Sequence, residues 1–343
     1  MFDAKTVGMP QKIAFLLLPD FSMMAFTSSV EPLRAANRLS GKTHYSWHIV
    51  THDGRPARAS NGIALVPDGS LFEDFDAWTL FVCAGVRAER FNDQKVFDRL
   101  RELARRGMAL GGVCTGSLAL ARAGLLDGYR CTIHWENMEG FVEDFPRLDI
   151  TATLFEIDRE RFTCSGGTAP LDMMIYAISR DFSDELAIGV AEQMLHNFVR
   201  QPHDKQRMSI QYRTGISNPK LLAVIAYMEA YLESPVALNE LATSVDMSVR
   251  QLERLFRNHL GKTPMRYYLE LRLQRARLLL RQTTMPIVQV AVASGFASAS
   301  HFARCYRELF DCAPRSDRMQ REGAGIKGNG SNSPTSGTAR FSD

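Results

Sequence analysis

The spacing of apolar residues divides the chain into two parts with different predicted secondary structure. In the first part, short apolar runs alternate with segments of helical spacing, and the connections between them are short. This alternation is typical of an α/β layer fold with a mostly parallel sheet. Strands are predicted at 13–18, 45–51, 79–83 and 109–113, and helices at 29–39, 91–106, 117–123, 171–180 and 185–199.

From residue 218 onward no strand pattern appears, and one pattern occurs twice, at 241–264 and again at 290–314. Each copy consists of a short apolar helix, a tight turn and a second helix with arginines on its outer face. This is the plan of a helix-turn-helix, whose second helix enters the major groove of DNA. Further helices are predicted at 220–233 and at 265–281, the latter joining the two units. Two units in one chain can read two successive grooves without a partner subunit.

Local signals mark the turns and helix starts of both units. Ser248 and Gln251 form a capping-box pattern at the start of the first recognition helix, and Ser298 is the expected N-cap of the second. Gly295 supplies the positive-φ residue of the second turn. Asp246 takes that place in the first turn, where aspartate tolerates the left-handed conformation better than most residues do.

The polar residues on the outer faces of the two recognition helices are candidate DNA contacts. Arginine and glutamine can pair bidentately with base edges, whereas serine and the remaining arginines more often hold phosphate. One such helix alone would more often be a solvated surface, but the duplicated unit favours DNA binding. The candidates are Ser248, Arg250, Gln251, Arg254, Arg257, Ser298, Ser300, His301, Arg304 and Arg307.

Residues 220–318 resemble the AraC/XylS-type DNA-binding domain. The resemblance rests on Gly261-Lys-Thr-Pro264, Ser294-Gly-Phe296, His301-Phe302 and the closing pair Ala313-Pro314. It implies seven helices, with both recognition helices in adjacent major grooves on one face of double-stranded DNA. One departure is Asp311, where that family usually has glycine.

Charge and length agree with this division. The 343-residue chain carries a net charge of +3, and residues 218–318 hold 14 Lys and Arg against 9 Asp and Glu, so the remainder is slightly acidic. A basic C-terminal module on such a body fits nucleic-acid contact at one end only. We expect a sensor domain at 12–200, a polar linker at 201–217, the DNA-binding domain at 218–318 and a disordered Gly- and Ser-rich tail at 319–343.

Cysteine usage and apolar runs bound the compartment. The six cysteines are scattered, with no CxxC pair and no histidine pair at zinc spacing, which predicts a reduced protein without metal or cofactor. No signal peptide is recognised, and no apolar run approaches the roughly 18 residues that span a bilayer. The sequence therefore predicts a cytoplasmic protein with no membrane partner.

The segment Gly111-Gly-Val-Cys-Thr-Gly-Ser117 is the sharpest motif of the first part. A strand runs into a small-residue turn and then a helix, which is the geometry of a nucleophile elbow with Cys114 at its corner. His134, twenty residues on, would serve as a base partner. The alternative is that Cys114 is only a small buried residue on a tight turn.

Residues 12–200 resemble class I glutamine-amidotransferase-like proteins, in the branch that forms the N-terminal half of GlxA-type transcriptional regulators. This resemblance implies a flavodoxin-like three-layer sandwich. Active relatives place an acidic residue after the first strand, but residues 21–26 contain no carboxylate, and the nearest are Asp20 and Glu31. A cysteine without such a partner is a poor catalyst, so we expect no enzyme. The motifs that carry the resemblance are Leu18–Phe21, Glu31–Asn37, the Cys114 elbow, Ala123–Gly128, His134-Trp135 and Cys164–Asp172.

The pocket of this fold is then expected to bind a ligand at the C-terminal ends of the strands. Trp135 would present an aromatic face to a cation, balanced by Glu136 or Glu31, unless it is a packing residue. The segment Gln193-x-x-His196…Arg200…Gln206-Arg207 resembles regulators of amino-acid or quaternary-amine catabolism. The candidate ligand-binding residues are Phe21, Gly85, Cys114, Thr115, His134 and Trp135.

These observations predict a transcription regulator, and an activator in particular, that responds to a small nitrogenous metabolite. We expect it to act as a homodimer and to contact RNA polymerase. One alternative is a thiol-dependent hydrolase or amidotransferase fused to a DNA-binding module. Another is a constitutive architectural DNA binder with a dispensable N-terminal domain.

Overall fold

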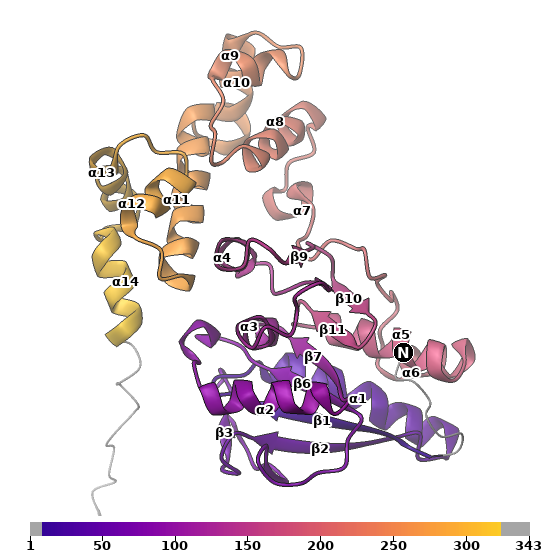
Figure 1. The fold of residues 1–343 in the computed structure, drawn as a ribbon. Coiled ribbons are helices and arrows are strands. Elements are labelled where there is room, and N and C mark those ends of the chain that lie inside the picture. The colour runs from indigo at the N-terminus through magenta and orange to yellow at the C-terminus, as the bar shows by residue number, and fades with distance from the viewer. Residues whose placement is uncertain (1–8, 324–343) are drawn as a thin grey trace, which may run out of the picture. The chain divides into compact units, whose positions relative to one another are not determined.

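The computed structural model describes residues 9–323, and the chain divides between Leu222 and Ala223 into two compact units (Figure 1). The first unit is an α/β domain and the second is helical, which confirms the predicted fold classes. Residues 319–323 of the expected tail are helical, whereas the rest of that tail lies outside the described residues.

A seven-stranded sheet forms the centre of the first unit. Neighbouring strands are parallel except for the antiparallel pair β10 and β11 at one edge. The order is β10 (Phe155–Asp158), β11 (Arg161–Cys164), β7 (Ala109–Val113), β6 (Thr79–Cys83), β1 (Gln11–Leu17), β2 (Tyr45–Thr51) and β5 (Gly69–Ser70). Two small pairs lie outside it: β3 (Ala57–Arg58) with β4 (Ala64–Leu65), and β8 (Arg130–Cys131) with β9 (Asp149–Ile150).

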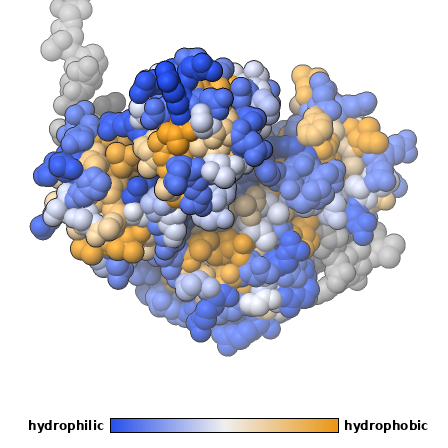
Figure 2. Space-filling model, turned by 90° about the horizontal axis from the view of Figure 1, so that it is seen from above, coloured by the Kyte–Doolittle hydropathy of each residue, from blue (hydrophilic) through white to orange (hydrophobic). Residues whose placement is uncertain are grey.

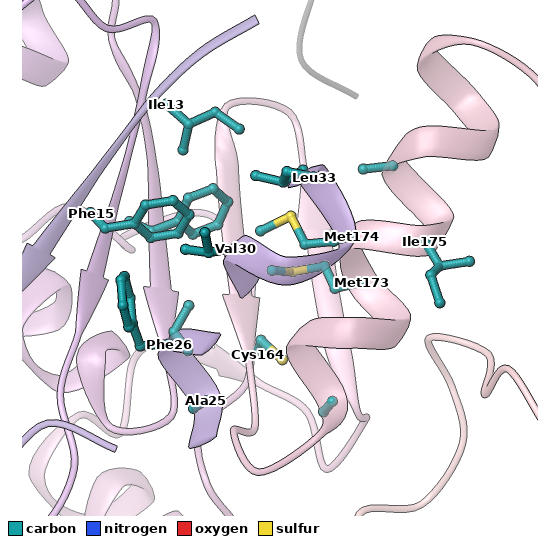
Figure 3. Packing of buried hydrophobic residues seen from close by; sticks show 14 of the residues in the cluster. Ile13, Phe15, Ala25, Phe26, Val30, Leu33, Cys164, Met173, Met174 and Ile175 are labelled. Atoms are coloured by element: carbon teal, nitrogen blue, oxygen red, sulfur yellow. The ribbon is translucent and has the colours of Figure 1, made fainter. Parts of the chain in front are cut away.

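Helices cover both faces of this sheet, so that β1 is buried on both sides and reads as a continuous apolar run. Phe15 faces α1, α5 and α6, where Met173 and Met174 of α5 pack towards it (Figure 3). Leu16 faces the opposite layer with α2 and α3. The helices are α1 (Met23–Ser40), the 3₁₀ turn η1 (Ala88–Arg90), α2 (Gln94–Arg105), α3 (Gly116–Arg122), α4 (Met138–Asp144), α5 (Ala169–Asp181) and α6 (Asp184–Gln193). This is the predicted three-layer sandwich.

Two predicted helices differ most from the structure in where they begin or end. The helix predicted at 29–39 begins at Met23, because Ser22 caps it by accepting a hydrogen bond from the Ala25 amide at 3.3 Å. The helix predicted at 185–199 ends at Gln193, since Leu195 adopts a φ of +53° and turns the chain. The residues after this turn are held by α5 instead.

The segment 201–217, expected as a linker, is partly fixed to the first unit. The carbonyl oxygen of Pro202 accepts a hydrogen bond from the Leu154 amide at 2.9 Å, and Lys205 pairs with Thr153 in an isolated bridge. A short helix, α7 (Ile210–Thr214), follows. The chain then enters the helical unit through α8.

Helices α8 to α14 form the C-terminal module, in agreement with the seven helices that the resemblance implies. No strand occurs after Leu222 in the part of this unit that the structure describes. One apolar cluster joins Leu273 and Leu280 of α11 to Phe302 and Tyr306 of α13. The helices are α8 (Pro219–Ala230), α9 (Leu238–Thr243), α10 (Val249–Leu260), α11 (Pro264–Gln282), α12 (Ile287–Ala293), α13 (Ala299–Phe310) and α14 (Pro314–Gly323).

Candidate functional site

The first helix-turn-helix consists of α9 and α10, and its recognition helix begins with a complete capping box. The Ser248 hydroxyl accepts from the Gln251 amide at 3.3 Å, and the Gln251 side-chain oxygen accepts from the Ser248 amide at 2.8 Å. Leu252 and Phe256 are fully buried beneath α10. The turn residue Asp246 has a φ of +52°, as predicted. The cap thus holds the side-chain oxygen of Gln251, which a bidentate contact to adenine would have to release.

The second helix-turn-helix consists of α12 and α13, and its turn requires glycine. Gly295 has a φ of +74°, and a Cβ atom there would lie 2.6 Å from the Leu232 carbonyl oxygen. The Ser298 hydroxyl accepts from the His301 amide at 3.4 Å and caps α13, while Phe302 and Tyr306 are buried. Both caps and both turn residues therefore occur where the sequence predicted them.

The helix α11 joins the two units and is fixed to the second by polar contacts. Arg272 donates to the Ser294 carbonyl oxygen at 2.9 Å, and its guanidinium carbon lies 4.3 Å from the centre of the Phe296 ring. With 19 residues and a rise of ~1.5 Å per residue, α11 is a rod of about 28 Å. This rod separates the two helix-turn-helix units within the C-terminal module.

A buried carboxylate joins α11, α13 and α14, and no motif in the sequence predicted it. Asp317 is 1% exposed and accepts hydrogen bonds from Tyr306 at 2.6 Å, Arg277 at 2.8 Å and Arg281 at 2.7 Å. Burial alone would raise the pKa of Asp317, but these hydrogen bonds outweigh it and hold the pKa below its usual value. This ionised carboxylate stabilises the second helix-turn-helix.

All the candidate DNA contacts are exposed. They alternate with the buried stripe of each recognition helix, and the ion pair of Arg304 with Glu308 on the same helix is long, at 3.9 Å. A pair so exposed contributes little and leaves the arginine available to a ligand. The exposed residues are Ser248, Arg250, Gln251, Arg254 and Arg257 on the first unit and Ser298, Ser300, His301, Arg304 and Arg307 on the second.

In the α/β domain, Cys114 stands at the predicted elbow between β7 and α3. Its φ is +60°, and Gly116 is required because a Cβ there would lie 1.9 Å from the Val82 carbonyl oxygen. Cys114 is 8% exposed, and burial together with the nearby Glu136 carboxylate raises the pKa of its thiol to about 11, although hydrogen bonds from Thr115 oppose this. The thiol is therefore protonated at neutral pH.

Buried neighbours support the turn at Cys114. The Thr115 hydroxyl donates to the Gly85 carbonyl oxygen at 2.7 Å, and a Cβ on Gly85 would lie 2.4 Å from the Asp20 carbonyl oxygen. Phe21 is fully buried and packs edge-on against Phe26 at 5.9 Å. Phe21 and Gly85 pair in an isolated bridge, and they present no side chain of their own to a ligand.

His134 and Trp135 lie on the half-buried turn that leads to α4. The Glu136 amide donates to His134 Nδ1 at 3.3 Å, which places the ring proton on Nε2. Burial lowers the pKa of His134, although the Glu136 carboxylate opposes this. No hydrogen bond links His134 to Cys114 among the described residues, so the elbow lacks an assembled base.

The two acids considered in the sequence both have partners elsewhere. Asp20 forms an ion pair with Arg87 at 2.6 Å, and Glu31 accepts from the Arg34 side chain at 2.8 Å. Glu136 is the carboxylate that acts on both Cys114 and His134. Between residues 9 and 323, no group of three or more His, Cys, Asp or Glu side chains is placed to hold a metal ion.

Residues 194–207 are held against this domain by two polar anchors. Asp172 is fully buried and accepts from His196 Nε2 at 2.8 Å and from the Arg200 side chain at 2.6 Å. Gln206 donates through Nε2 to the Ile133 carbonyl oxygen at 3.0 Å, directly before His134 and Trp135. The motif noted in the sequence thus fixes the chain that leaves the domain.

Figure 2 shows hydrophilic residues covering most of one face of the molecule, with hydrophobic patches between them. Where the chain is described, no helix combines the length and apolar character that a membrane crossing requires.

Fold and site together define a DJ-1/PfpI-type α/β domain joined to an AraC-type DNA-binding module. Residues 11–175 match the DJ-1/PfpI family, and residues 241–320 match a helix-turn-helix domain. A solved structure of an AraC family transcriptional regulator from Pseudomonas putida is 32% identical, with a TM-score of 0.50, over 54% of this chain and 100% of that chain.

Full-length relatives identify the family. The chain is 48% identical over 310 residues to the HTH-type transcriptional regulator GbdR of Pseudomonas aeruginosa, covering 90% of this chain and 84% of GbdR. It is 47% identical to CdhR of the same species, over 90% of this chain and 92% of CdhR. It is 38% identical to GlxA of Rhizobium meliloti, over 90% of this chain and 96% of GlxA. The chain belongs to this family of HTH-type transcriptional regulators, as the sequence motifs predicted.

Proposed function

We propose that this protein reads a promoter with α10 and α13 in two adjacent major grooves and that a small nitrogenous metabolite bound to its N-terminal domain controls it. The observation that carries the proposal is the pair of capped recognition helices joined by α11. The ~28 Å length of that helix is comparable with the ~34 Å between successive major grooves on one face of DNA.

Arg254 and Arg304 are the residues that we assign to base reading, because each is exposed near the middle of its recognition helix. Replacing either with alanine should cost about 1–3 kcal/mol at one base position. Footprinting of the full chain on its own promoter region, at fixed salt, measures this loss. Arg266→Ala on α11, whose side chain pairs with Glu270 at 3.4 Å, is the matched control and should leave the footprint unchanged. Equal footprints for all three variants and the parent would refute the assignment.

The N-terminal domain is proposed to bind its effector beside Cys114, Thr115, His134 and Trp135. The protonated thiol of Cys114 supports binding over catalysis, and the nearby Glu136 carboxylate favours a ligand that carries a positive charge. Effector binding then shifts the population between two arrangements of the regulator. We further propose that the protein acts in the cytoplasm as a homodimer that activates transcription through contact with RNA polymerase.

The strained elbow at Cys114 favours one alternative, a thiol-dependent hydrolase or amidotransferase fused to the DNA-binding module. Cys114→Ser separates the two functions, because serine preserves the turn and removes the thiol. Effector-dependent transcription that survives this substitution supports the binding function. Loss of turnover of a substrate would establish the enzyme instead.

A further inference from the structure

An arginine from the segment that leaves the α/β domain covers the aromatic face of the proposed effector site. The guanidinium carbon of Arg207 lies 4.6 Å from the centre of the Trp135 ring. This is the geometry of a cation–π contact, in which a cation is attracted to the negative face of the ring. One face of Trp135, a position that an organic cation could take, is therefore filled by a cation of the protein itself.

The residue before Arg207 fastens the same segment to the turn that carries Trp135. Gln206 donates through Nε2 to Thr132 Oγ1 at 3.0 Å, to the Ile133 carbonyl oxygen at 3.0 Å and to the Thr153 carbonyl oxygen at 2.8 Å. Its side-chain oxygen is buried and has no hydrogen-bond partner within residues 9–323. A buried acceptor left in this state costs free energy, so the attachment is incomplete and open to competition.

Local charge favours a cation on this ring whatever its origin. The Glu136 carboxylate adjoins Trp135 in sequence and acts on both His134 and Cys114. It adds to the effect of burial in raising the pKa of Cys114, and it opposes the effect of burial, which lowers the pKa of His134. Arg207 thus contributes a positive charge to a negative neighbourhood. A free ammonium or guanidinium ion would be attracted in the same way.

We propose that Arg207 is a tethered stand-in for a cationic effector. Without effector, its guanidinium occupies Trp135 and holds residues 201–207 on the domain. An organic cation that takes the ring displaces Arg207 and releases the segment that leads to α8. This inference rests on the proposed function, in that it requires the effector to bind around Trp135, and it adds the residue that competes with the effector and the segment that responds to it.

Competition predicts how the affinity for a cation should change when Arg207 is removed. The apparent affinity of a ligand is reduced in proportion to the fraction of protein molecules whose site is free. Arg207→Ala in the full chain should therefore bind tetramethylammonium about tenfold more tightly than the parent, given the usual strength of a cation–π contact. Calorimetry at matched ionic strength measures this. Methylguanidinium, which reproduces the head of Arg207, is titrated in parallel to distinguish the two cation types.

Arg159→Ala is the matched control, because Arg159 also stacks on an aromatic ring of this domain, with its guanidinium carbon 3.9 Å from the centre of Tyr129. It should leave both affinities unchanged. Trp135→Leu should abolish the binding of either cation. Hydrogen exchange of the parent protein, which needs no variant, should show faster exchange of the amides in 205–209 when tetramethylammonium is added.

An Arg207→Ala protein that binds both cations no more tightly than the parent would overturn the stand-in role, and Arg207 would be a packing residue. Failure of both cations to bind parent and variant alike would overturn the assignment of a cationic effector. Neither result touches the proposed control of a promoter by a bound metabolite, which fails instead if no metabolite raises the melting temperature of the full chain or changes its promoter footprint.

Discussion

The guanidinium of Arg272 donates a hydrogen bond to the carbonyl oxygen of Ser294 at 2.9 Å, across the interface between α11 and the second helix-turn-helix. The same side chain stacks on Phe296, so one residue holds both the turn and the first ring of the cluster beneath it. The orientation of α13 thus depends on a residue that lies outside the helix-turn-helix itself.

Arg272→Ala should destabilise the C-terminal unit by about 2 kcal/mol, because it leaves the Ser294 carbonyl without its charged donor. Thermal unfolding followed by circular dichroism measures the loss, and hydrogen exchange should place it in α12 and α13. Arg266→Ala on the same helix should change stability by less than ~0.5 kcal/mol. Equal losses for the two variants would contradict the role of Arg272.

Asp317 should make the stability of this unit depend on pH in the acid range. Its pKa is lowered in the folded state, so the carboxylate contributes stability above its unfolded pKa of about 3.9, and this contribution is lost as the pH falls through the lower folded value. Asp317→Asn should cost about 2 kcal/mol at neutral pH and should remove part of the acid dependence. Unfolding free energies measured between neutral and acid pH for both proteins test this; parallel curves would refute it.

Substitutions at two left-handed positions should have opposite effects on stability, because glycine is the favoured residue at both. Asp311 ends α13 with a φ of +54°, a left-handed conformation that glycine adopts at lower cost, so Asp311→Gly should raise stability by about 1 kcal/mol. Gly295→Ala should lower stability by at least ~2 kcal/mol, since its Cβ would meet the Leu232 carbonyl oxygen. Melting temperatures of the two variants should move in opposite directions, and a shift of both in one direction would exclude this account.

Gln251 has two separable roles, as a cap and as a candidate DNA contact. Gln251→Glu preserves the capping box and adds a negative charge at the helix start, so stability should be unchanged or slightly higher. DNA affinity should fall by tenfold or more, because the carboxylate repels phosphate and cannot donate to a base. Gln251→Ala, which loses the cap, should cost about 1 kcal/mol. Unchanged DNA affinity in the glutamate variant would limit Gln251 to capping.

Cys114 should react slowly with iodoacetamide at neutral pH. Its thiol has a pKa of about 11, so the reactive thiolate is scarce at pH 7, and the rate should rise about tenfold per pH unit towards that value. Glu136→Gln should speed the reaction, because the Glu136 carboxylate raises the pKa. Peptide mass spectrometry with Cys114→Ser as a blank gives the rate. Rapid labelling at pH 7 with no further rise would indicate an activated thiol.

Local spacing was sufficient to predict the features that depend on neighbouring residues. The cap at Ser248, the glycine turn at Gly295 and the elbow at Cys114 each follow from residues within one turn of the chain, and the structure confirms them. The exposure of the candidate DNA contacts was predictable for the same reason, since helical periodicity separates the exposed face from the buried one, whereas their contact with DNA stays a prediction.

The side-chain contacts that could not be predicted from the sequence connect segments far apart in the chain. Asp172 meets Arg200 across 28 residues, and Asp317 meets Arg277 across 40, with no periodic signal to connect them. The end of α6 at Gln193 was missed because the left-handed turn that follows it is made by Leu195, and no glycine marks it in the sequence. Likewise, Phe21 was expected at a ligand surface because of its motif, whereas tertiary packing places it in the core.

The tandem arrangement of α10 and α13 along α11 has a consequence for the operator. A twofold dimer of single helix-turn-helix units reads a palindrome, which looks the same from either strand. Under the proposed function, two recognition helices of different sequence follow each other in each chain, so the two DNA segments that one chain reads differ and its DNA element has a direction. Inverting that element upstream of a start site would turn the bound regulator to face away from the transcribed gene.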